Sequence, residues 1–222
     1  PHGLLERLRV SNVPAADQLE NSPGGTAVRA AFEASGIRFT ASQPGMEKRF
    51  NDAVAELAEC IKPIPETGTI LQEGGVYLGC WLESTGTINS ELLSRFVPNV
   101  AANTFAGFAQ HQRADGLFPY KLTADGPVFS QIQLVSPLAR SIWNHYRLIS
   151  ADKAWLRTLY EAMARYDDWI AKYRDTRGTG AVEAFCAYDT GHDLSARFWH
   201  IPDSPLANDS ASYNPDNALL PL

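Results

Sequence analysis

The chain has 222 residues, of which 45% are hydrophobic and 20% are charged, a composition typical of a globular domain and not of a disordered tail or a fibrous repeat. The net charge is −6, and no stretch gathers Lys and Arg into a stripe that could neutralise a nucleic-acid backbone. Apolar runs such as residues 132–138 are far shorter than the roughly 20 residues that span a bilayer, so we expect neither a nucleic-acid partner nor a membrane span.

Residues 1–41 are expected to form an N-terminal arm or linker, and residues 42–222 the domain itself. The arm shows little periodicity because Pro14 and other breakers interrupt it. From residue 46 to residue 61, apolar side chains recur at spacings of three and four, and Pro63 follows. This pattern predicts an amphipathic helix with a defined end.

Three further helices are predicted along the chain. Apolar positions within residues 92–108 favour a second helix, with Pro98 in a kink or near its first turn. Residues 132–146 favour a third helix and residues 155–170 a fourth. Because only residues 148–152 separate the last two, we expect them to be antiparallel neighbours. Strand alternation is scarce, so the predicted fold is mainly α, with helical hairpins that build a toroid.

The loop after the fourth helix is rich in carboxylates and aromatic rings. Within residues 188–199 stand two carboxylates, a His, an Arg and three rings, the mixture needed to stack on sugar faces and to hold hydroxyl groups. A carboxyl group among such rings is expected to have a raised pKa and to donate a proton near neutral pH. The alternative is a solvated turn in which Asp189 or Asp193 caps the next helix and Arg197 forms a surface ion pair.

One segment of this loop carries a specific resemblance. Residues 189–198 read DTGHDLSARF. They resemble the (D/E)-(S/T)-G-W-D-x-S-x-R-(W/F) motif of the inverting glycoside hydrolases related to trehalase and to family 63 α-glucosidases and mannosylglycerate hydrolases. In that motif the second Asp is the general acid, so the resemblance assigns this role to Asp193. His192 stands where those enzymes carry Trp.

Further landmarks of the same family lie upstream. The segments DGLFP, SQ, WNHY and DKAWL are similar in order and spacing to its DGxxP, SQPP, WxxY and D-x-x-(F/W)-L landmarks; they begin at Asp115, Ser130, Trp143 and Asp152. Trp81 and Glu83 sit where the family has an aromatic residue followed by W-D-S or W-D-T, whose carboxylate binds the sugar beyond the cleaved bond. The similarity spans roughly residues 74–199.

The resemblance implies a fold, a reaction and a set of binding residues. The fold is an (α/α)6 barrel of twelve helices, of which this chain would be the first part, with the catalytic base, a Glu, beyond Leu222. The reaction is hydrolysis of an α-glycosidic bond in a small glucoside or mannoside with inversion, in which Asp193 protonates the leaving oxygen and the base activates water. The substrate-binding residues would be Trp81, Glu83, Gln131, Tyr188, His192, Arg197 and Trp199.

Two other functions stay open at this point. The first is a helical toroid that binds carbohydrate or a protein partner without turnover. The second is another glycosidase on the same toroid, such as a debranching glucosidase or a rhamnosidase, with its acid elsewhere.

Cofactors and metals are not expected. The three cysteines, Cys60, Cys80 and Cys186, match no metal-ligand spacing, and no GxGxxG or GxSxG motif occurs. This cysteine usage leaves the cellular compartment open. We expect a small carbohydrate as the partner. We expect Trp143, Trp155 and Trp169, at helical spacing, to pack in the core, and His111 and His145 to be ordinary core or surface residues.

Overall fold

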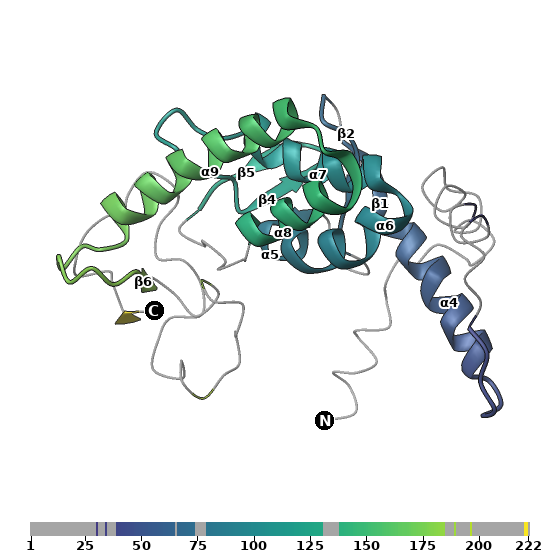
Figure 1. Cartoon of the computed structure of the whole chain (residues 1–222). Coiled ribbons are helices and arrows are strands. Elements are labelled where there is room, and N and C mark those ends of the chain that lie inside the picture. Colours follow the sequence, from purple (N-terminus) through teal and green to yellow (C-terminus); the bar gives the residue numbers. More distant parts are fainter. Residues whose placement is uncertain are drawn as a thin grey trace.

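Helices dominate the part of the chain that the computed structural model describes (Figure 1). That part comprises residues 30, 34, 39–64, 66–73, 79–130, 138–184, 189, 196 and 220–221. The prediction of a mainly α protein is therefore confirmed for these residues. Most of the predicted N-terminal arm lies outside them, so its boundary at residue 41 stays a prediction.

The first long helix follows the predicted periodicity. α4 (Met46–Glu59) presents Val54, Leu57 and Ala58 to a buried cluster that includes Leu93 and Val97. The helix ends two residues before the predicted residue 61. The reason is that Ile61 begins the strand β1 (Ile61–Ile64), which pairs in antiparallel fashion with β2 (Gly68–Leu71).

The next helical segment turns back on itself and forms a hairpin. α5 (Leu82–Ile88), the π-helical turn η1 (Asn89–Leu93) and α6 (Ser94–Phe96) follow one another without a break, and α7 (Pro98–Gln110) returns beside them. The prediction of one helix over residues 92–108 is wrong, because the helical segment ends at Phe96 and the chain reverses at Val97. Pro98 is the first residue of α7, where its missing N–H group costs nothing, which is one of the two places that the sequence left open for it. The side-chain amide of Asn89 donates to the carbonyl oxygen of Ala101 at 3.0 Å and joins the two arms.

A second hairpin follows the same plan. α8 (Leu138–His145) continues into the π-helical turn η2 (Tyr146–Ser150), and α9 (Lys153–Tyr173) packs against α8. Ala151 takes a left-handed conformation between them, and the carboxylate of Asp152 accepts hydrogen bonds from the first backbone N–H groups of α9. The predicted third and fourth helices are thus confirmed where they are described, whereas residues 131–137 lie outside that part.

The two hairpins lie side by side with the same orientation. Ser141 of α8 donates to the carbonyl oxygen of Gly86 in α5, and one α-helical turn further His145 is hydrogen-bonded to Ser94 of α6. From the first contact to the second, the residue numbers increase in both segments, so α5 and α8 run in the same direction. α7 and α9 do the same, since Phe105 meets the ring of Trp155 and Gln112 donates to the carbonyl oxygen of Ala162.

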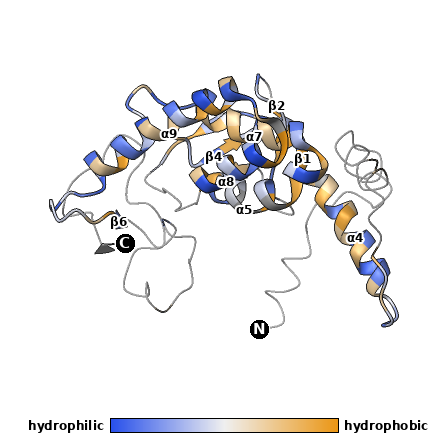
Figure 2. Cartoon of the chain, in the orientation of Figure 1, coloured by the Kyte–Doolittle hydropathy of each residue, from blue (hydrophilic) through white to orange (hydrophobic). Residues whose placement is uncertain are grey.

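The main core fills the space between the hairpins. Figure 2 shows hydrophobic residues gathering where α7 meets the short strands, while hydrophilic residues are frequent along α9. This cluster consists of Ile64, Ile70, Cys80, Leu82, Phe105, Phe108, Phe118, Leu122, Leu138, Ile142, Leu159 and Ala162. It joins both hairpins and the strands into one unit.

Short strands are a second feature that periodicity did not predict, after the helix α5 and the reversal of the chain at Val97. β3 (Cys80–Trp81), β4 (Lys121–Thr123) and β5 (Gly126–Val128) form an antiparallel sheet, and β6 (Glu183–Ala184) pairs with β7 (Leu220–Pro221). Strands of two or three residues are too short to show an alternating pattern. Their register still matters, because it sets Trp81 directly opposite Lys121.

The three helical tryptophans differ in their surroundings. Trp169 is 1% exposed and Trp155 packs against the core, as expected. The prediction for Trp143 is wrong, because this side chain is 48% exposed. Trp143 stands two residues from both Ser141 and His145, which contact the first hairpin, so it lies on the opposite face of α8. Periodicity alone predicts an apolar side chain at this position but not what covers it.

Candidate functional site

Two of the sequence landmarks, at Trp81 and Glu83 and at Asp115, lie at one end of the two hairpins, whereas WNHY and DKAWL lie toward the other end, where α8 leads into α9. Because α5 and α8 run in one direction and α7 and α9 return, the starts of the first pair lie at the same end as the ends of the second pair. Trp81 and Glu83 stand at the start of α5, and the loop at Asp115 follows α7. The loop after α9 leads toward Asp189 and Asp193. This end of the hairpins is therefore the candidate site.

Trp81 is placed by the three-stranded sheet. It is the last residue of β3 and the residue before α5, and its half-buried ring lies under the ammonium group of Lys121, with Nζ 4.5 Å from the ring centroid. Glu83 is exposed in the first turn of α5. Burial raises the pKa of the neighbouring Cys80 to about 12, so this thiol is neutral and is no candidate nucleophile.

The DGLFP segment after α7 has a structural role. The carboxylate of Asp115 accepts hydrogen bonds from the guanidinium group of Arg113, from the backbone N–H of Leu117 and from the indole N–H of Trp169. The hydrogen bond from Arg113 is the largest cause that lowers the pKa of Asp115, and it outweighs the partial burial that opposes it. Gly116 has φ +101°, and a Cβ atom there would lie 2.3 Å from the carbonyl oxygen of Arg165, so only glycine fits.

A buried ion pair holds the loop after α9. The guanidinium group of Arg174, at the C-terminal end of α9, contacts the carboxylate of Asp189, and the two side chains are only 3% and 1% exposed. Arg174 also donates to the backbone carbonyl oxygen of Glu183 at 3.1 Å. Burial raises the pKa of the nearby phenol of Tyr166, with the charges of Arg174 and Asp189 acting in opposite senses. The start of the DTGHD segment is thereby fixed to the end of α9.

The carboxylate of Glu183 forms a second anchor in the same loop. It is 1% exposed and accepts hydrogen bonds from the N–H and hydroxyl groups of Thr176 and from the N–H and guanidinium groups of Arg177. Burial alone would raise the pKa of Glu183, but the hydrogen bonds from Thr176 and Arg177 lower it below its usual value. This carboxylate therefore stays ionised and holds the loop, which is not the property of a proton donor.

Sequence reasoning missed Arg174 and Glu183. Neither belongs to a family landmark, and the patterns available were apolar periodicity and motif spacing. A sequence signal that could have identified them is the pair of opposite charges that flank the Gly178 to Gly180 turn. Arg174 stands before the turn, at the end of a helix, and Glu183 follows it. Only the fold brings both side chains into the interior.

Most of the predicted site residues lie outside the part of the chain that the structure describes. Asp193, the predicted acid, lies outside the described residues. So do six other residues singled out for the site or its landmarks, namely Gln131, Tyr188, His192, Arg197, Phe198 and Trp199. Of the predicted substrate-binding residues, the structure describes Trp81 and Glu83 and brings them to the same helix start. It also describes Asp189, four residues before the predicted acid.

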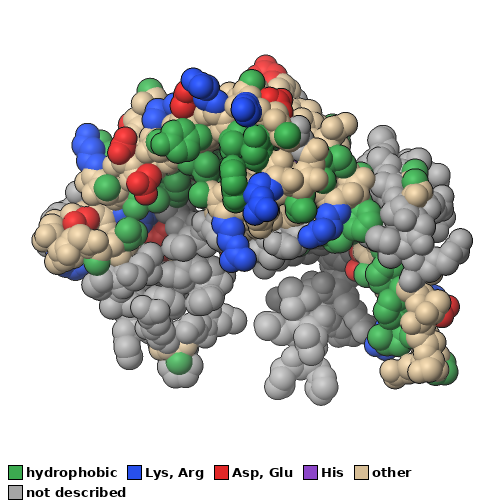
Figure 3. All heavy atoms as spheres, viewed as in Figure 1, with side chains coloured by type: hydrophobic (Ala, Val, Ile, Leu, Met, Phe, Trp, Pro, Cys, Tyr) green, Lys and Arg blue, Asp and Glu red, His purple; other side chains and the backbone are tan. Residues whose placement is uncertain are grey.

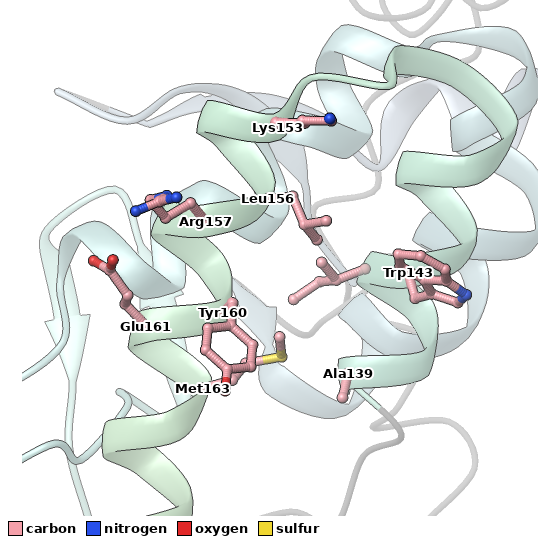
Figure 4. Close-up of a pocket in the computed structure, with 9 residues that line it drawn as sticks. Ala139, Trp143, Lys153, Leu156, Arg157, Tyr160, Glu161 and Met163 are labelled. Atoms are coloured by element: carbon pink, nitrogen blue, oxygen red, sulfur yellow. The ribbon is translucent and has the colours of Figure 1, made fainter.

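A groove of about 630 Å³ lies elsewhere, between α8 and α9 (Figure 4). Trp143 and Ala139 of α8 face Leu156, Tyr160 and Met163 of α9 across it, and Figure 3 shows apolar side chains gathered on the surface over these helices. Tyr160 is 66% exposed. The described residues that line this groove include none of the predicted site residues, so it is an apolar surface and not the candidate site.

Two further observations concern the described residues alone. They contain no helix that is long and apolar enough to cross a membrane. Nor do they bring together three or more His, Cys, Asp or Glu side chains that could hold a metal ion.

A comparison with known protein families gives a match. The family described as the mannosylglycerate hydrolase MGH1-like glycoside hydrolase domain matches residues 81–216. This span begins at Trp81 and includes the two hairpins, the Arg174 and Asp189 pair and the segment around Asp193. No curated protein matches the chain significantly.

Proposed function

The chain belongs to the MGH1-like glycoside hydrolase family, and we propose that it cleaves an α-glycosidic bond of a small glucoside or mannoside with inversion at the anomeric carbon. Membership makes the protein a glycosidase of carbohydrate metabolism. The bond, the sugar and the stereochemistry are our proposal. The observation that carries it is the DTGHDLSARF segment, which lies inside the matched span.

Asp193 is the proposed general acid. It donates its proton to the glycosidic oxygen as the bond from that oxygen to the anomeric carbon breaks. A second carboxylate takes a proton from a water molecule that attacks the opposite face of the sugar, so the product has the inverted configuration. Inverting enzymes hold the two carboxyl groups about 6.5–9.5 Å apart, which leaves room for that water.

The buried pair of Arg174 and Asp189 supports this assignment. A general acid has to lie within hydrogen-bonding reach of the leaving oxygen, and small displacements cost large factors in rate. Asp189 begins the motif and is tied to the end of a 21-residue helix. We propose that this anchor positions the segment that carries Asp193, which makes Arg174 and Asp189 positioning residues.

We assign recognition of the sugar to Trp81 and Glu83 and to residues of the adjacent loops. Glu83 would accept hydrogen bonds from sugar hydroxyl groups, and the ring of Trp81 would stack on the sugar. Lys121, held against that ring, favours a substrate with a negatively charged aglycone such as glycerate. The remaining contacts are proposed for residues of the adjacent loops, namely Gln131, Tyr188, His192, Arg197 and Trp199.

We propose further that the hairpins are part of an (α/α)6 toroid. The support is that two consecutive hairpins stack with the same orientation, α5 beside α8 and α7 beside α9, as a toroid of repeated hairpins requires. The groove at Trp143 and Tyr160 lies between α8 and α9 and is lined largely by apolar side chains. In a toroid this apolar surface would receive the next hairpin.

A substrate panel with analysis of the product tests the proposal. The purified protein is assayed on trehalose, kojibiose, nigerose, mannosylglycerate, glucosylglycerate, sucrose and soluble starch, and NMR follows the first anomer released. We expect a small α-linked substrate to be best and the β-anomer to appear first. Starch as the best substrate would contradict the small-substrate assignment, and binding without turnover would favour a carbohydrate-binding protein. Release of the sugar whose anomeric bond is cleaved as its α-anomer would contradict inversion; on trehalose, inversion gives equal amounts of α- and β-glucose and retention gives α-glucose alone.

A further inference from the structure

A small polar pocket lies between the two π-helical turns, at the other end of the hairpins. Its volume is about 280 Å³. Its described lining consists of Ser90, Arg95, Asn144, Arg147 and Leu148. Ser90 comes from η1, Arg95 from α6, and the other three from the junction of α8 and η2. Of these five residues, only Asn144 belongs to a family landmark, the WNHY segment.

The backbone of this pocket is held in place by a buried contact. The hydroxyl of Ser94 and Nδ1 of His145 are 2.8 Å apart and hydrogen-bonded in the interior. Arg95 directly follows Ser94 in the chain, and Asn144 directly precedes His145. The hydrogen bond therefore fixes the backbone positions of Arg95 and Asn144 relative to each other. π-helical turns insert an extra residue and are frequent at functional sites. Here two of them border one pocket.

Ser90 supplies a second and independent observation. This residue is only 2% exposed, and its hydroxyl oxygen has no hydrogen-bond partner among the described residues. A buried hydroxyl without a partner is costly, and native proteins rarely keep one without a reason. A ligand that accepts a hydrogen bond in the pocket would satisfy it.

The chemistry of the lining selects an anion. Arg95 and Arg147 carry two positive charges, none of the five lining residues is acidic, and the chain as a whole has a net charge of −6. A guanidinium group can only donate hydrogen bonds, in a planar fork that matches the oxygens of a phosphate group, and the hydroxyl of Ser90 and the amide of Asn144 add donors. We propose that this pocket binds a phosphate group, as the free anion or as a phosphate monoester.

The pocket is separate from the candidate active site. Arg95 stands twelve residues after Glu83 along the continuous helical segment from α5 to α6, which corresponds to about 18 Å at the helical rise of about 1.5 Å per residue. The proposal therefore does not rest on the proposed glycosidase function. A phosphate group here would clamp η1 against η2 and stabilise the packing of the two hairpins.

The test measures phosphate binding directly. The protein is titrated with inorganic phosphate in a calorimeter at pH 7.5 and constant ionic strength, and the melting temperature is recorded with phosphate and with chloride. We expect saturable binding and a higher melting temperature in phosphate. The double variant Arg95→Gln/Arg147→Gln should bind at least tenfold more weakly, whereas Arg140→Gln, exposed on α8 and outside the pocket, should bind within twofold of the parent protein.

A third variant separates binding from folding. Ser90→Ala should melt at the same temperature as the parent protein without phosphate, or higher, because it removes an unpaired hydroxyl, and it should bind phosphate several-fold more weakly. Titration with glycerol 1-phosphate separates the two sources: tighter binding than inorganic phosphate identifies a monoester, and equal or weaker binding identifies the free anion. The proposal is overturned if phosphate has no more effect than chloride, or if the double variant binds as well as the parent protein.

Discussion

The guanidinium group of Arg174 and the carboxylate of Asp189 form a buried ion pair that ties the end of α9 to the first residue of the DTGHD segment. An ion pair with side chains 3% and 1% exposed differs from an exposed pair, because removal of one partner leaves a charge in the interior that water cannot reach. The contact also connects helix packing with the loop that carries the proposed acid.

Asp189→Asn should destabilise the protein strongly. The amide keeps the shape of the side chain but leaves the buried guanidinium uncompensated, so we expect the free energy of unfolding to fall by about 3–5 kcal/mol. Urea unfolding followed by circular dichroism measures this. The control is Asp52→Asn, which breaks the exposed pair with Lys48 on α4 and should cost about 0.5 kcal/mol or less. A loss below about 1 kcal/mol for Asp189→Asn would contradict the structural importance of the pair.

Asp193→Asn should fold normally and lose most of its activity on natural glycosides. The amide cannot deliver a proton to a poor leaving group, and general acid catalysis is typically worth about 10²–10⁴-fold in rate. The measurement is kcat on the best substrate of the panel, with Asp52→Asn as the control carboxylate. A glycosyl fluoride, which hardly needs protonation, should be much less affected. Activity within about threefold of the parent protein, or an equal loss on the fluoride, would remove Asp193 from the acid role.

Glu83→Gln should weaken substrate binding more than it slows the chemistry. If the carboxylate accepts hydrogen bonds from a sugar hydroxyl, its loss lowers kcat/KM by roughly 10- to 100-fold, mainly through KM. Steady-state kinetics on the best substrate give the two constants separately. Glu56→Gln, exposed on α4, is the matched control and should leave both unchanged. A fall in kcat with an unchanged KM would instead place Glu83 in the chemical step.

Gly116→Ala should be far more damaging than Gly178→Ala. Both glycines have positive φ, at 101° and 65°. A Cβ atom on Gly116 would lie 2.3 Å from the carbonyl oxygen of Arg165, whereas one on Gly178 would have no atom within 4 Å. We expect a loss of about 3 kcal/mol or more at Gly116, from strain plus overpacking, against about 1–2 kcal/mol at Gly178. Chemical denaturation of the two variants compares them, and equal losses would rule out the steric explanation.

His145 should make the protein less stable at mildly acidic pH. Burial lowers the pKa of His145, so between pH 7 and pH 5 the unfolded chain takes up a proton on this ring more readily than the folded protein. The free energy of unfolding should therefore fall as the pH falls below about 6.5, by at most about 1.4 kcal/mol per pH unit for one proton. Urea unfolding at several pH values gives the slope. His145→Gln should have a shallower slope in this range, and an unchanged slope would contradict the assignment.

Local patterns in the sequence determined several of the helices and the family. Apolar residues at spacings of three and four define α4 and α9 because each helix buries one face, and Pro98 marks the start of α7 because proline fits only the first turn of a helix. The DTGHDLSARF segment is contiguous, so its resemblance to a glycosidase motif needs no fold to be recognised. The family match over residues 81–216 confirms that resemblance.

Only the tertiary structure decided which distant residues meet. The cation over the Trp81 ring comes from Lys121, forty residues away, and depends on the register of two strands too short to show a pattern. Arg174 and Asp189 lie fifteen residues apart, on either side of a turn, and their charges alone did not distinguish a buried pair from a surface one. Periodicity likewise predicted that Trp143 lies on an apolar face of α8, but not which element covers that face. Amphipathicity specifies which side of a helix is apolar, whereas the packing of the hairpins specifies what covers it.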